Sequence, residues 1–462
     1  MCYFIAARNY AEYLKYNNHY VFAKMANPVL AFAKSFHLSF QNENNIFKNL
    51  PNHVSDSFLV RKRNNFTSNA TNGPSHPRVK NVILYVMESV AAEYVAGYEG
   101  TYKATPQIER HLSESMVFKD VYAHSPQSTN SLFSLLGSAY PLISFKILIN
   151  EHPEIKWPTL SSVLKKQNYK TAFFQASDNT YMRVDEFLSY RSFDKVLDHR
   201  QMPCTSDLFT SAAVGVGEGQ DEGCMVNAFS DWLTRDVNQQ PFFAMLWTIQ
   251  THWPYFVFGP EKDFGVKNAE LNRYLNALNQ SDAALGKLLD DLKQKGLSES
   301  TLVIVVGDHG EAFGQHRQTG HGTDIYEENV RVPLIFINPL LFNGQEKSVV
   351  GGHVDVAATI LDILNLKAPQ EWQGTSLFDA SRVNIAYFFS TWTDYFFGYR
   401  TPKHKVILNA YANKTMIFDM HQDPKETVDL AVQKPELVKS SYKSLAQWIQ
   451  YNRTLMNTRL KK

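Results

Sequence analysis

The sequence predicts an α/β fold in which a mainly parallel central sheet carries helices on both faces, followed by a small antiparallel α+β subdomain. Two observations predict this class. Runs of β-branched and aliphatic residues alternate with helical patterns through the larger part of the chain, as in parallel, helix-covered sheets. After residue 377, short strand-like runs follow one another and end in one helical pattern.

The expected elements can be placed in order along the chain. In the larger part, strand-like runs cover residues 81–87, 171–175, 242–246, 301–306 and 334–337, and a helical pattern covers 275–293. In the last part, they cover residues 383–389, 396–400, 405–408 and 416–419, with a final helix at 435–453. Residues 1–50 have aromatic residues at helical spacings, and residues 51–78 have the Pro, Gly and Asn content of a linker. We therefore expect an N-terminal helical or juxtamembrane segment (1–50), a linker (51–78), a main domain (79–377) and a small subdomain (378–462).

Composition is that of a globular protein and excludes some partners. The 462 residues are 44% hydrophobic and 20% charged, and 46 basic against 45 acidic residues leave no overall field to attract nucleic acid. We expect no transmembrane helix within this chain, because no run reaches ~18 apolar residues, and the start lacks the layout of a signal peptide. Cys204 and Cys224 could be bridged outside the cytosol or stay free, and Cys2 is left over.

Polar residues of catalytic types follow two of the apolar runs directly. Asp308 and His309 follow the run that ends at residue 306, and Glu88 follows the run that ends at residue 87. Ligands bind at the carboxyl ends of strands in open α/β sheets, and carboxylate with imidazole suits a divalent metal such as zinc or manganese. Taken singly, each residue has a plainer interpretation, as a helix cap or a packed histidine.

A third candidate lies between these two strand ends. Ser128 and Thr129 lead straight into an apolar helical pattern. A hydroxyl at a helix N-terminus can be polarised by the helix dipole and by a bound cation, which turns a weak nucleophile into an alkoxide. The alternative is that both residues are ordinary helix caps.

Four segments in this order resemble the sulfatase-like branch of the alkaline phosphatase superfamily. They are residues 81–88, the segment at Ser128, residues 307–311 and residues 326–334, and the resemblance continues through 353–362, 373–377, 417–420 and 423–426. It covers roughly residues 78 to 450. The resemblance implies an alkaline phosphatase-like fold, with residues 79–377 as the catalytic domain.

The residue four positions after Ser128 distinguishes the branches of this superfamily. Sulfatases have a Cys or Ser that is oxidised to formylglycine, in a pattern with Arg at that position, where this chain has Leu132. The resemblance therefore implies a serine nucleophile, Ser128, as in lipoteichoic-acid synthases and phosphoethanolamine transferases. It also implies one divalent metal, Zn or Mn rather than Ca or Mg, held by Glu88, Ser128, Asp308 and His309.

The resemblance also supplies expectations for the rest of the site. His252, in a His-Trp-Pro segment, and His321, between two glycines, are expected to act as acid and base on the phosphoryl group. The plainer interpretation of His252 is a histidine packed in the core, and that of His321 is a histidine on a surface loop. Thr129, Asp178 and Arg183 are expected to contact the substrate; for Asp178 and Arg183 this expectation does not come from the resemblance but from the loop around them, which is expected to shape the pocket.

The expected function is a metal-dependent phosphotransferase of the cell envelope. It would transfer a phosphoglycerol- or phosphoethanolamine-type group from a phospholipid or envelope glycan through a phosphoserine intermediate, at the periplasmic or extracellular face of the membrane. Residues 27–36 resemble the segment that joins membrane helices to the catalytic domain in lipoteichoic-acid synthases, so membrane association through the N-terminal segment is expected. The alternative is a sulfatase-like hydrolase of sulfate esters or phosphodiesters, because the last subdomain resembles that of sulfatases. A protein with this fold but without activity is a third, less favoured reading.

Overall fold

The computed structural model describes residues 73–461 except 99, 203, 205–207, 211–217, 238 and 393, and it does not describe the side chains of residues 208–210 and 218. The expected N-terminal segment and most of the expected linker therefore lie outside the described residues.

A large mixed sheet forms the centre of the described part. Its strands are β1 (Asn81–Met87), β2 (Ser115–Tyr122), β3 (Lys170–Gln175), β4 (Lys195–Leu197), β7 (Phe242–Trp247), β8 (Thr301–Gly307), β11 (Arg331–Val332), β12 (Leu334–Ile337) and β13 (Gln345–Gly352). They lie in the order β11-β2-β12-β8-β1-β7-β3-β4, and β13 pairs with β2. β11 and β12 run antiparallel to their neighbours, whereas the other pairings are parallel. The prediction of a mainly parallel sheet is confirmed.

Four of these strands, β2, β4, β11 and β13, were not predicted from the sequence, and β2 and β13 are the longer two. β2 carries Lys119 and Asp120 in its middle, where both side chains are half-buried and interrupt the apolar pattern. β13 is exposed and polar over its first half and buried only from Val349 onward. Each strand therefore lacks the continuous apolar run that identifies a fully buried strand.

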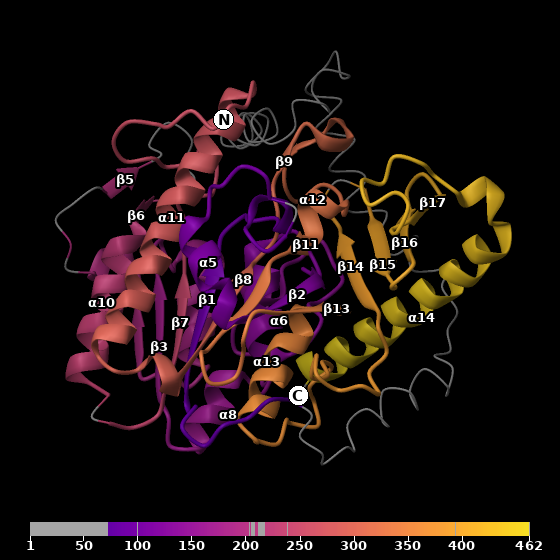
Figure 1. The fold of residues 1–462 in the computed structure, drawn as a ribbon. Helices are drawn as coiled ribbons and strands as arrows, with labels where there is room; N and C mark the ends of the chain where they lie inside the picture. Colours follow the sequence, from indigo (N-terminus) through magenta and orange to yellow (C-terminus); the bar gives the residue numbers. More distant parts are fainter. Residues whose placement is uncertain are drawn as a thin grey trace, which may run out of the picture.

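Helices cover both faces of the sheet (Figure 1). The central strands β1 and β8 are therefore buried along their whole length. Val82 and Leu84 of β1 face one hydrophobic core, and Ile83 and Tyr85 face the other. The first core is closed by α6 (Ser128–Gly137), α8 (Leu160–Lys166), α9 (Val184–Ser189) and α13 (His353–Ile363). The second is closed by α5 (Pro106–His111), α10 (Glu222–Arg235) and α11 (Ala269–Gln294). The expectation of helices on both faces is confirmed.

A small antiparallel sheet follows, as predicted. β14 (Ala386–Ser390), β15 (Phe396–Arg400), β16 (His404–Asn409) and β17 (Lys414–Asp419) are neighbours in this order, and α14 (Pro435–Leu460) packs on them. The core under α14 also contains Tyr140, Ile143 and Val354 from the larger part of the chain. In addition, the backbone N–H of Phe389 donates to the carbonyl of His124 at 2.9 Å. The small sheet is therefore packed onto the large domain, and the boundary at residue 377 stays a prediction.

Trp448 should carry much of the stability of this packing. Its side chain is fully buried in α14 and stacks on Tyr387 with ring centroids 4.9 Å apart. We expect Trp448→Ala to lower the free energy of unfolding by roughly 3–5 kcal/mol, because it leaves a large cavity. Tyr442→Ala is the matched control on the same helix, since Tyr442 is 40% exposed, and it should cost less than about 1 kcal/mol. Urea unfolding of both variants measures the difference, and equal losses would contradict this packing.

Candidate active site

The strand order brings the two predicted strand ends together. β8 lies next to β1, with Gly307 paired to Met87, so Asp308, His309 and Glu88 leave the sheet side by side. One ligand atom from each of these three buried residues lies within 4.8 Å of the others. The structure therefore forms a group of two carboxylates and one imidazole at the carboxyl edge of the sheet.

Ser128 is the first residue of α6 and points its hydroxyl into this group. Its Oγ lies 3.1 Å from Glu88 Oε1 and 3.2 Å from His309 Nε2. The preceding residue, Gln127, makes no side-chain cap to the helix. The first backbone N–H groups of α6 are thus not occupied by a cap, and helix N-termini of this kind bind anions. A phosphoryl or sulfuryl group beside Ser128 would meet these donors.

Buried threonine and tryptophan side chains hold Glu88 in place. Thr248 Oγ1 accepts from the backbone N–H of Glu88 at 2.9 Å, and Thr251 Oγ1 donates to its carbonyl. Trp247 Nε1 donates to Glu88 Oε2 at 3.1 Å, which leaves Oε1 facing Ser128. Trp247 is the last residue of β7, the other neighbour of β1, and Thr248 and Thr251 come after it in the chain. The central three strands therefore fix both the backbone and the side chain of Glu88.

The backbone at Asp308 and His309 orients their free atoms toward the same point. Asp308 Oδ1 accepts from the backbone N–H groups of Ser89 and His309, both at 2.7 Å, whereas its Oδ2 is buried without a hydrogen-bond partner. His309 Nδ1 lies 2.9 Å from the Gly310 carbonyl and donates to it, so Nε2 carries the lone pair. This is the arrangement by which a metal-binding histidine is fixed in one tautomer.

The electrostatics of the group favour a cation. Burial and the neighbouring Glu88 raise the pKa of Asp308 well above its ordinary value. Burial lowers the pKa of His309 to about 3, which keeps its ring neutral. The two carboxylates and the neutral imidazole of this group contribute no positive charge of their own, and buried charges are normally paired or coordinate a metal. The orphaned Asp308 Oδ2 and the O, O, N donor set thus fit a divalent ion, with Zn or Mn remaining the prediction for its identity.

His321 and His252 both lie beside this group. The His321 ring centroid is 4.2 Å from that of His309 and 5.8 Å from that of His252. His321 Nδ1 donates to Glu311 Oε2 at 2.6 Å. Burial lowers the pKa of His321, but the neighbouring Glu311 carboxylate outweighs burial, so the pKa is raised overall. Glu311 Oε1 also accepts from the Tyr255 hydroxyl at 3.0 Å. The structure brings both histidines to the site, and their acid and base roles stay predictions.

The three residues expected to contact substrate are placed differently. Thr129 follows Ser128 in α6 and is buried. Asp178 pairs with Arg200 at 3.0 Å, and Arg183 makes two hydrogen bonds of 2.8 Å to Glu186. The structure therefore puts Asp178 and Arg183 in ion pairs of their own, without a contact to the Glu88 group. Their role in substrate binding stays a prediction.

The segment around Arg183 is nevertheless strained. Met182 and Arg183 are consecutive non-glycine residues with φ of 50° and 58°. Such conformations cost free energy and concentrate at functional sites. The segment follows β3, whose carboxyl end lies on the same edge of the sheet as Glu88.

Several residues of the site were not predicted as site residues. They are Glu311, which holds His321, and Trp247, Thr248 and Thr251, which hold Glu88. Position was the available signal: Glu311 lies two residues after His309, and the other three end or follow the β7 run. The partner of Glu311 is ten positions away, whereas Trp247, Thr248 and Thr251 lie 159 to 163 positions from Glu88, so no local pattern marks those three.

A second group also has metal-ligand spacing among the described residues. It consists of His316, Glu328 and Glu426. Lys405 is fully buried 2.9 Å from Glu426 Oε1, and His316 Nδ1 donates to Glu328 Oε1 at 2.7 Å. The side chains of this group already supply cations for its carboxylates, so it is an ion-paired cluster.

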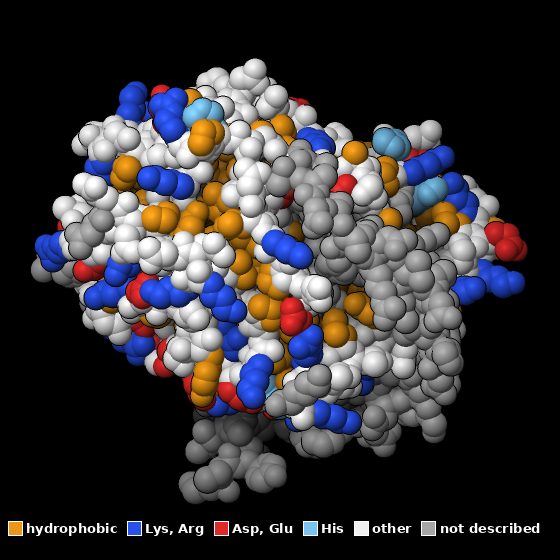
Figure 2. All heavy atoms as spheres, turned by 90° about the horizontal axis from the view of Figure 1, so that it is seen from below, with side chains coloured by type: hydrophobic (Ala, Val, Ile, Leu, Met, Phe, Trp, Pro, Cys, Tyr) orange, Lys and Arg blue, Asp and Glu red, His pale blue; other side chains and the backbone are white. Residues whose placement is uncertain are grey.

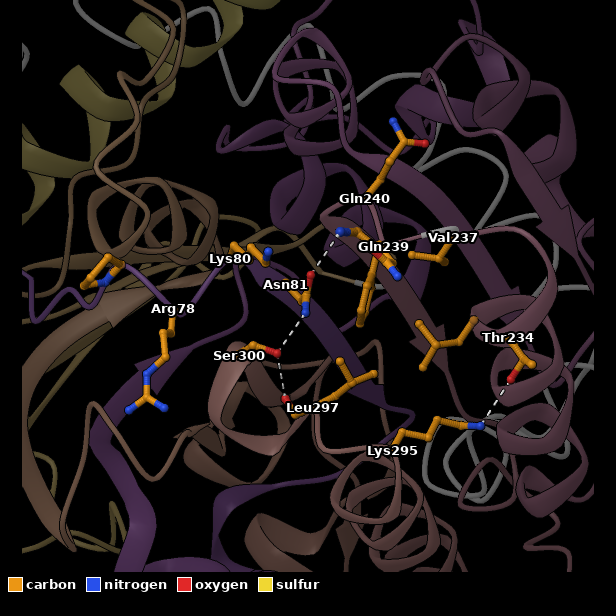
Figure 3. A pocket seen from close by; sticks show the side chains of 13 residues that line it. Arg78, Lys80, Asn81, Thr234, Val237, Gln239, Gln240, Lys295, Leu297 and Ser300 are labelled. Carbon is orange, nitrogen blue, oxygen red and sulfur yellow. Dashed lines mark hydrogen bonds between the residues drawn. The ribbon is translucent and has the colours of Figure 1, made fainter.

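A cavity of about 650 Å³ lies at the opposite edge of the sheet. It is lined by the amino ends of β1 and β7 and by the ends of α10 and α11, with Asn81, Thr234 and Lys295 among its residues (Figure 3). Figure 2 shows this underside of the molecule, where hydrophobic side chains lie among Lys and Arg side chains. None of the residues predicted for catalysis lines this cavity.

Comparison with known proteins agrees with this fold and site. The sulfatase family profile matches residues 80–366, and the profile of the C-terminal region of N-sulphoglucosamine sulphohydrolase matches residues 323–452. The chain therefore belongs to the sulfatase family.

Two curated relatives represent two branches of the family. The lipoteichoic acid synthase-like protein YvgJ of Bacillus subtilis is 26% identical over 331 residues, which are 66% of this chain and 51% of that protein. Arylsulfatase K of Canis lupus familiaris is 31% identical over 198 residues, which are 37% of this chain and 35% of that protein. The chain thus spans about half the length of the first relative.

Solved structures confirm the alkaline phosphatase-like fold. An alkaline phosphatase superfamily protein from Vibrio parahaemolyticus superposes with a TM-score of 0.69 at 18% identity, covering 89% of this chain and 99% of that one. The lipoteichoic acid synthase LtaP from Listeria monocytogenes superposes with a TM-score of 0.64 at 19% identity, covering 90% and 98%. Among the described residues, no helix has both the length and the apolar character needed to span a bilayer.

Removing one carboxylate should remove the metal. We expect Asp308→Asn to weaken the binding of Zn²⁺ or Mn²⁺ at least about tenfold, because it replaces a charged oxygen ligand in a buried group. Metal content after gel filtration, measured by mass spectrometry, checks this. Asp178→Asn is the control, since Asp178 pairs with Arg200 away from the group. Unchanged metal content in Asp308→Asn would refute the assignment of this group.

The cluster at His316 should make stability depend on alkaline pH. Both ring nitrogens of His316 donate, to Glu328 Oε1 and to the Glu426 carbonyl. Burial opposes the charge, but these acceptors raise the pKa of His316 from 6.5 to about 9. The stabilisation is fully present below pH 6.5 and is lost as the pH rises through about 9. Unfolding of wild type and His316→Gln across this range should show a difference that shrinks, and a constant difference would contradict the charged state.

Proposed function

We propose that the chain is a metal-dependent phosphotransferase that uses Ser128 as its nucleophile. The observation that carries this proposal is the position of the Ser128 hydroxyl, within hydrogen-bond distance of both Glu88 and His309. Glu88, Ser128, Asp308 and His309 would hold one divalent ion, Zn or Mn. When bound, such an ion lowers the pKa of a coordinated hydroxyl and neutralises phosphoryl oxygens.

The environment of Leu132 supports a serine rather than an aldehyde nucleophile. Leu132 stands where sulfatases of the formylglycine type have arginine, and it is buried in the core under α6. No cationic group is therefore present at that position to serve an oxidised residue. The unmodified hydroxyl of Ser128 is the group that the chain offers to a substrate.

The reaction can be written from the residues of the chain. Once the Ser128 hydroxyl has lost its proton to solvent, its Oγ forms a bond to phosphorus while the bond from phosphorus to the leaving oxygen breaks, and the protonated ring of His252 or His321 donates its proton to that oxygen. The uncapped N–H groups of α6 hold the phosphoryl oxygens. In the second half, an acceptor hydroxyl gives its proton to the same histidine and attacks phosphorus. The bond from Ser128 Oγ then breaks, which restores the enzyme.

The substrate class and the location follow from the same proposal. The group transferred is of the phosphoglycerol or phosphoethanolamine type, and the donor is a phospholipid or an envelope glycan. Lipoteichoic acid synthase-like relatives support this choice. The disulfide between Cys204 and Cys224 supports a location outside the cytosol, at the periplasmic or extracellular face of the envelope, because disulfides persist in oxidising compartments.

A second candidate function has its own support. The match to the C-terminal region of N-sulphoglucosamine sulphohydrolase and the arylsulfatase K relatives favour a hydrolase of sulfate esters or phosphodiesters on the same fold. In that case water takes the place of the acceptor hydroxyl. The two functions share the site and differ in the ester they accept and in the final acceptor.

Ser128→Ala should abolish turnover and leave metal binding largely intact, because Glu88, Asp308 and His309 remain. We expect the wild type with Mn²⁺ or Zn²⁺ to cleave bis(p-nitrophenyl) phosphate faster than p-nitrophenyl sulfate. Loss of the Ser128 hydroxyl should reduce that rate by roughly 10⁴-fold or more, since no other group can form the covalent intermediate. Release of p-nitrophenol measures both rates.

Thr129→Val is the matched control, because Thr129 is the next residue of α6, and it should lose less than about tenfold. Retained activity in Ser128→Ala, or a larger loss in Thr129→Val, would refute Ser128 as nucleophile. Preferred cleavage of the sulfate ester would instead favour the second candidate function.

A further inference from the structure

Glu426 makes three contacts that join separate parts of the chain. It lies in the loop that follows β17, is buried, and has φ of 54°. Its Oε2 accepts from the backbone N–H of Glu327 at 2.7 Å, and its own carbonyl accepts from His316 Nε2 at 3.2 Å. Its Oε1 lies 2.9 Å from Lys405 Nζ.

Two of these contacts hold the two ends of one segment. His316 and Glu327 bracket the stretch that contains His321. Its regular strand pairing is limited to β10 (Thr319–Gly320), which pairs with β9 (Ala312–Phe313) just before the stretch, and Gly320 and Gly322 have φ of 80° and 91°. A short ladder and flexible glycines give the stretch little rigidity of its own. Ser390 of β14 holds its middle by donating to the Gly322 carbonyl, and its shape depends further on what holds its ends.

The third contact ties Glu426 to the small sheet. Lys405 of β16 is fully buried and lies 2.9 Å from carboxylate oxygens of both Glu327 and Glu426. Its one positive charge can compensate only one of the two acids that approach each other at this point, and burial raises the pKa of Glu426 to about 8. His316, at one end of the stretch, stacks on Tyr326, at its other end, with ring centroids 3.8 Å apart. Glu426 of the C-terminal subdomain contacts both ends, His316 and Glu327. The stretch is consequently fastened to the C-terminal subdomain at both ends.

We propose that Glu426 is a positioning residue for His321. The carboxylate and carbonyl of Glu426 set the two ends of the stretch, and these ends determine where the His321 ring stands beside His309. The Glu311 hydrogen bond then fixes the rotation of that ring. This role rests on the proposed function, in which His321 handles a proton of the reaction. In this way the C-terminal subdomain contributes to catalysis without touching the substrate.

The order of the stretch can be measured without any substrate. Arg317 is exposed within it, so cleavage by trypsin after Arg317 reports how often the stretch opens. In the full chain, Glu426→Ala should increase the rate of this cleavage about tenfold or more. Glu426→Gln should lie between wild type and Glu426→Ala, because its amide oxygen can still accept from the N–H of Glu327. Gln422→Ala is the matched control in the same loop, since Gln422 is exposed and its hydrogen bonds to Asp419 come from its backbone N–H, and it should leave cleavage unchanged.

Activity supplies the second readout. Glu426→Ala should lower kcat about tenfold, as expected for a misplaced catalytic group, with KM and metal content unchanged. Wild-type cleavage after Arg317 in a folded Glu426→Ala protein would overturn the proposal, and so would unchanged kcat. If Glu426→Ala does not fold, His316→Gln removes one of the same contacts from the other side and must show the same faster cleavage. An inactive wild type would refute the proposed function, whereas the trypsin result would still decide the role of Glu426 in ordering the stretch.

Discussion

The in-register pairing of β1 with β8 is the constraint on which the site depends. Because Met87 lies opposite Gly307, the next residues of both strands leave the sheet at one point. Gly307 is required there, since a Cβ would lie 2.3 Å from the Val90 carbonyl oxygen. A slip of one residue would turn the following side chains to the other face of the sheet and separate the carboxylates.

The charges at this point explain much of the surrounding structure. Two carboxylates in a dry environment are costly, and the chain surrounds them with donors to specific oxygen atoms. Backbone N–H groups donate to Asp308 Oδ1, and Trp247 Nε1 donates to Glu88 Oε2. The other oxygen of each carboxylate, Asp308 Oδ2 and Glu88 Oε1, is thus directed to a common centre. The threonines of the β7 loop hold the Glu88 backbone against any rearrangement that would relieve the repulsion. These polar contacts at the ends of the three central strands thus hold Glu88 and Asp308 around one point.

The sequence allowed the central strands and the residues at their ends to be predicted, since long apolar runs followed by Asp308, His309 and Glu88 are local patterns. The approach of Ser128 to them agrees with the prediction from its place at a helix start, although the chemical roles of these residues stay predictions. What could not be predicted are contacts between distant loops. Thr248 meets Glu88 across 160 positions, and Glu426 meets His316 across 110. The edge strand β13 was not predicted for a related reason, because the exposed and polar first half of its sequence resembles a loop.

The shared core under α14 bears on how proteins of this family could be recombined. Tyr140 and Val354 belong to the larger part of the chain, yet they pack in the same cluster as Trp448 and Tyr387. A cut near residue 377 would therefore divide a single apolar interior and expose aromatic surface on both fragments. The part of the chain after residue 377 is not an exchangeable module, and functional chimaeras with relatives need crossover points that keep this interior and the Glu426 loop from one parent.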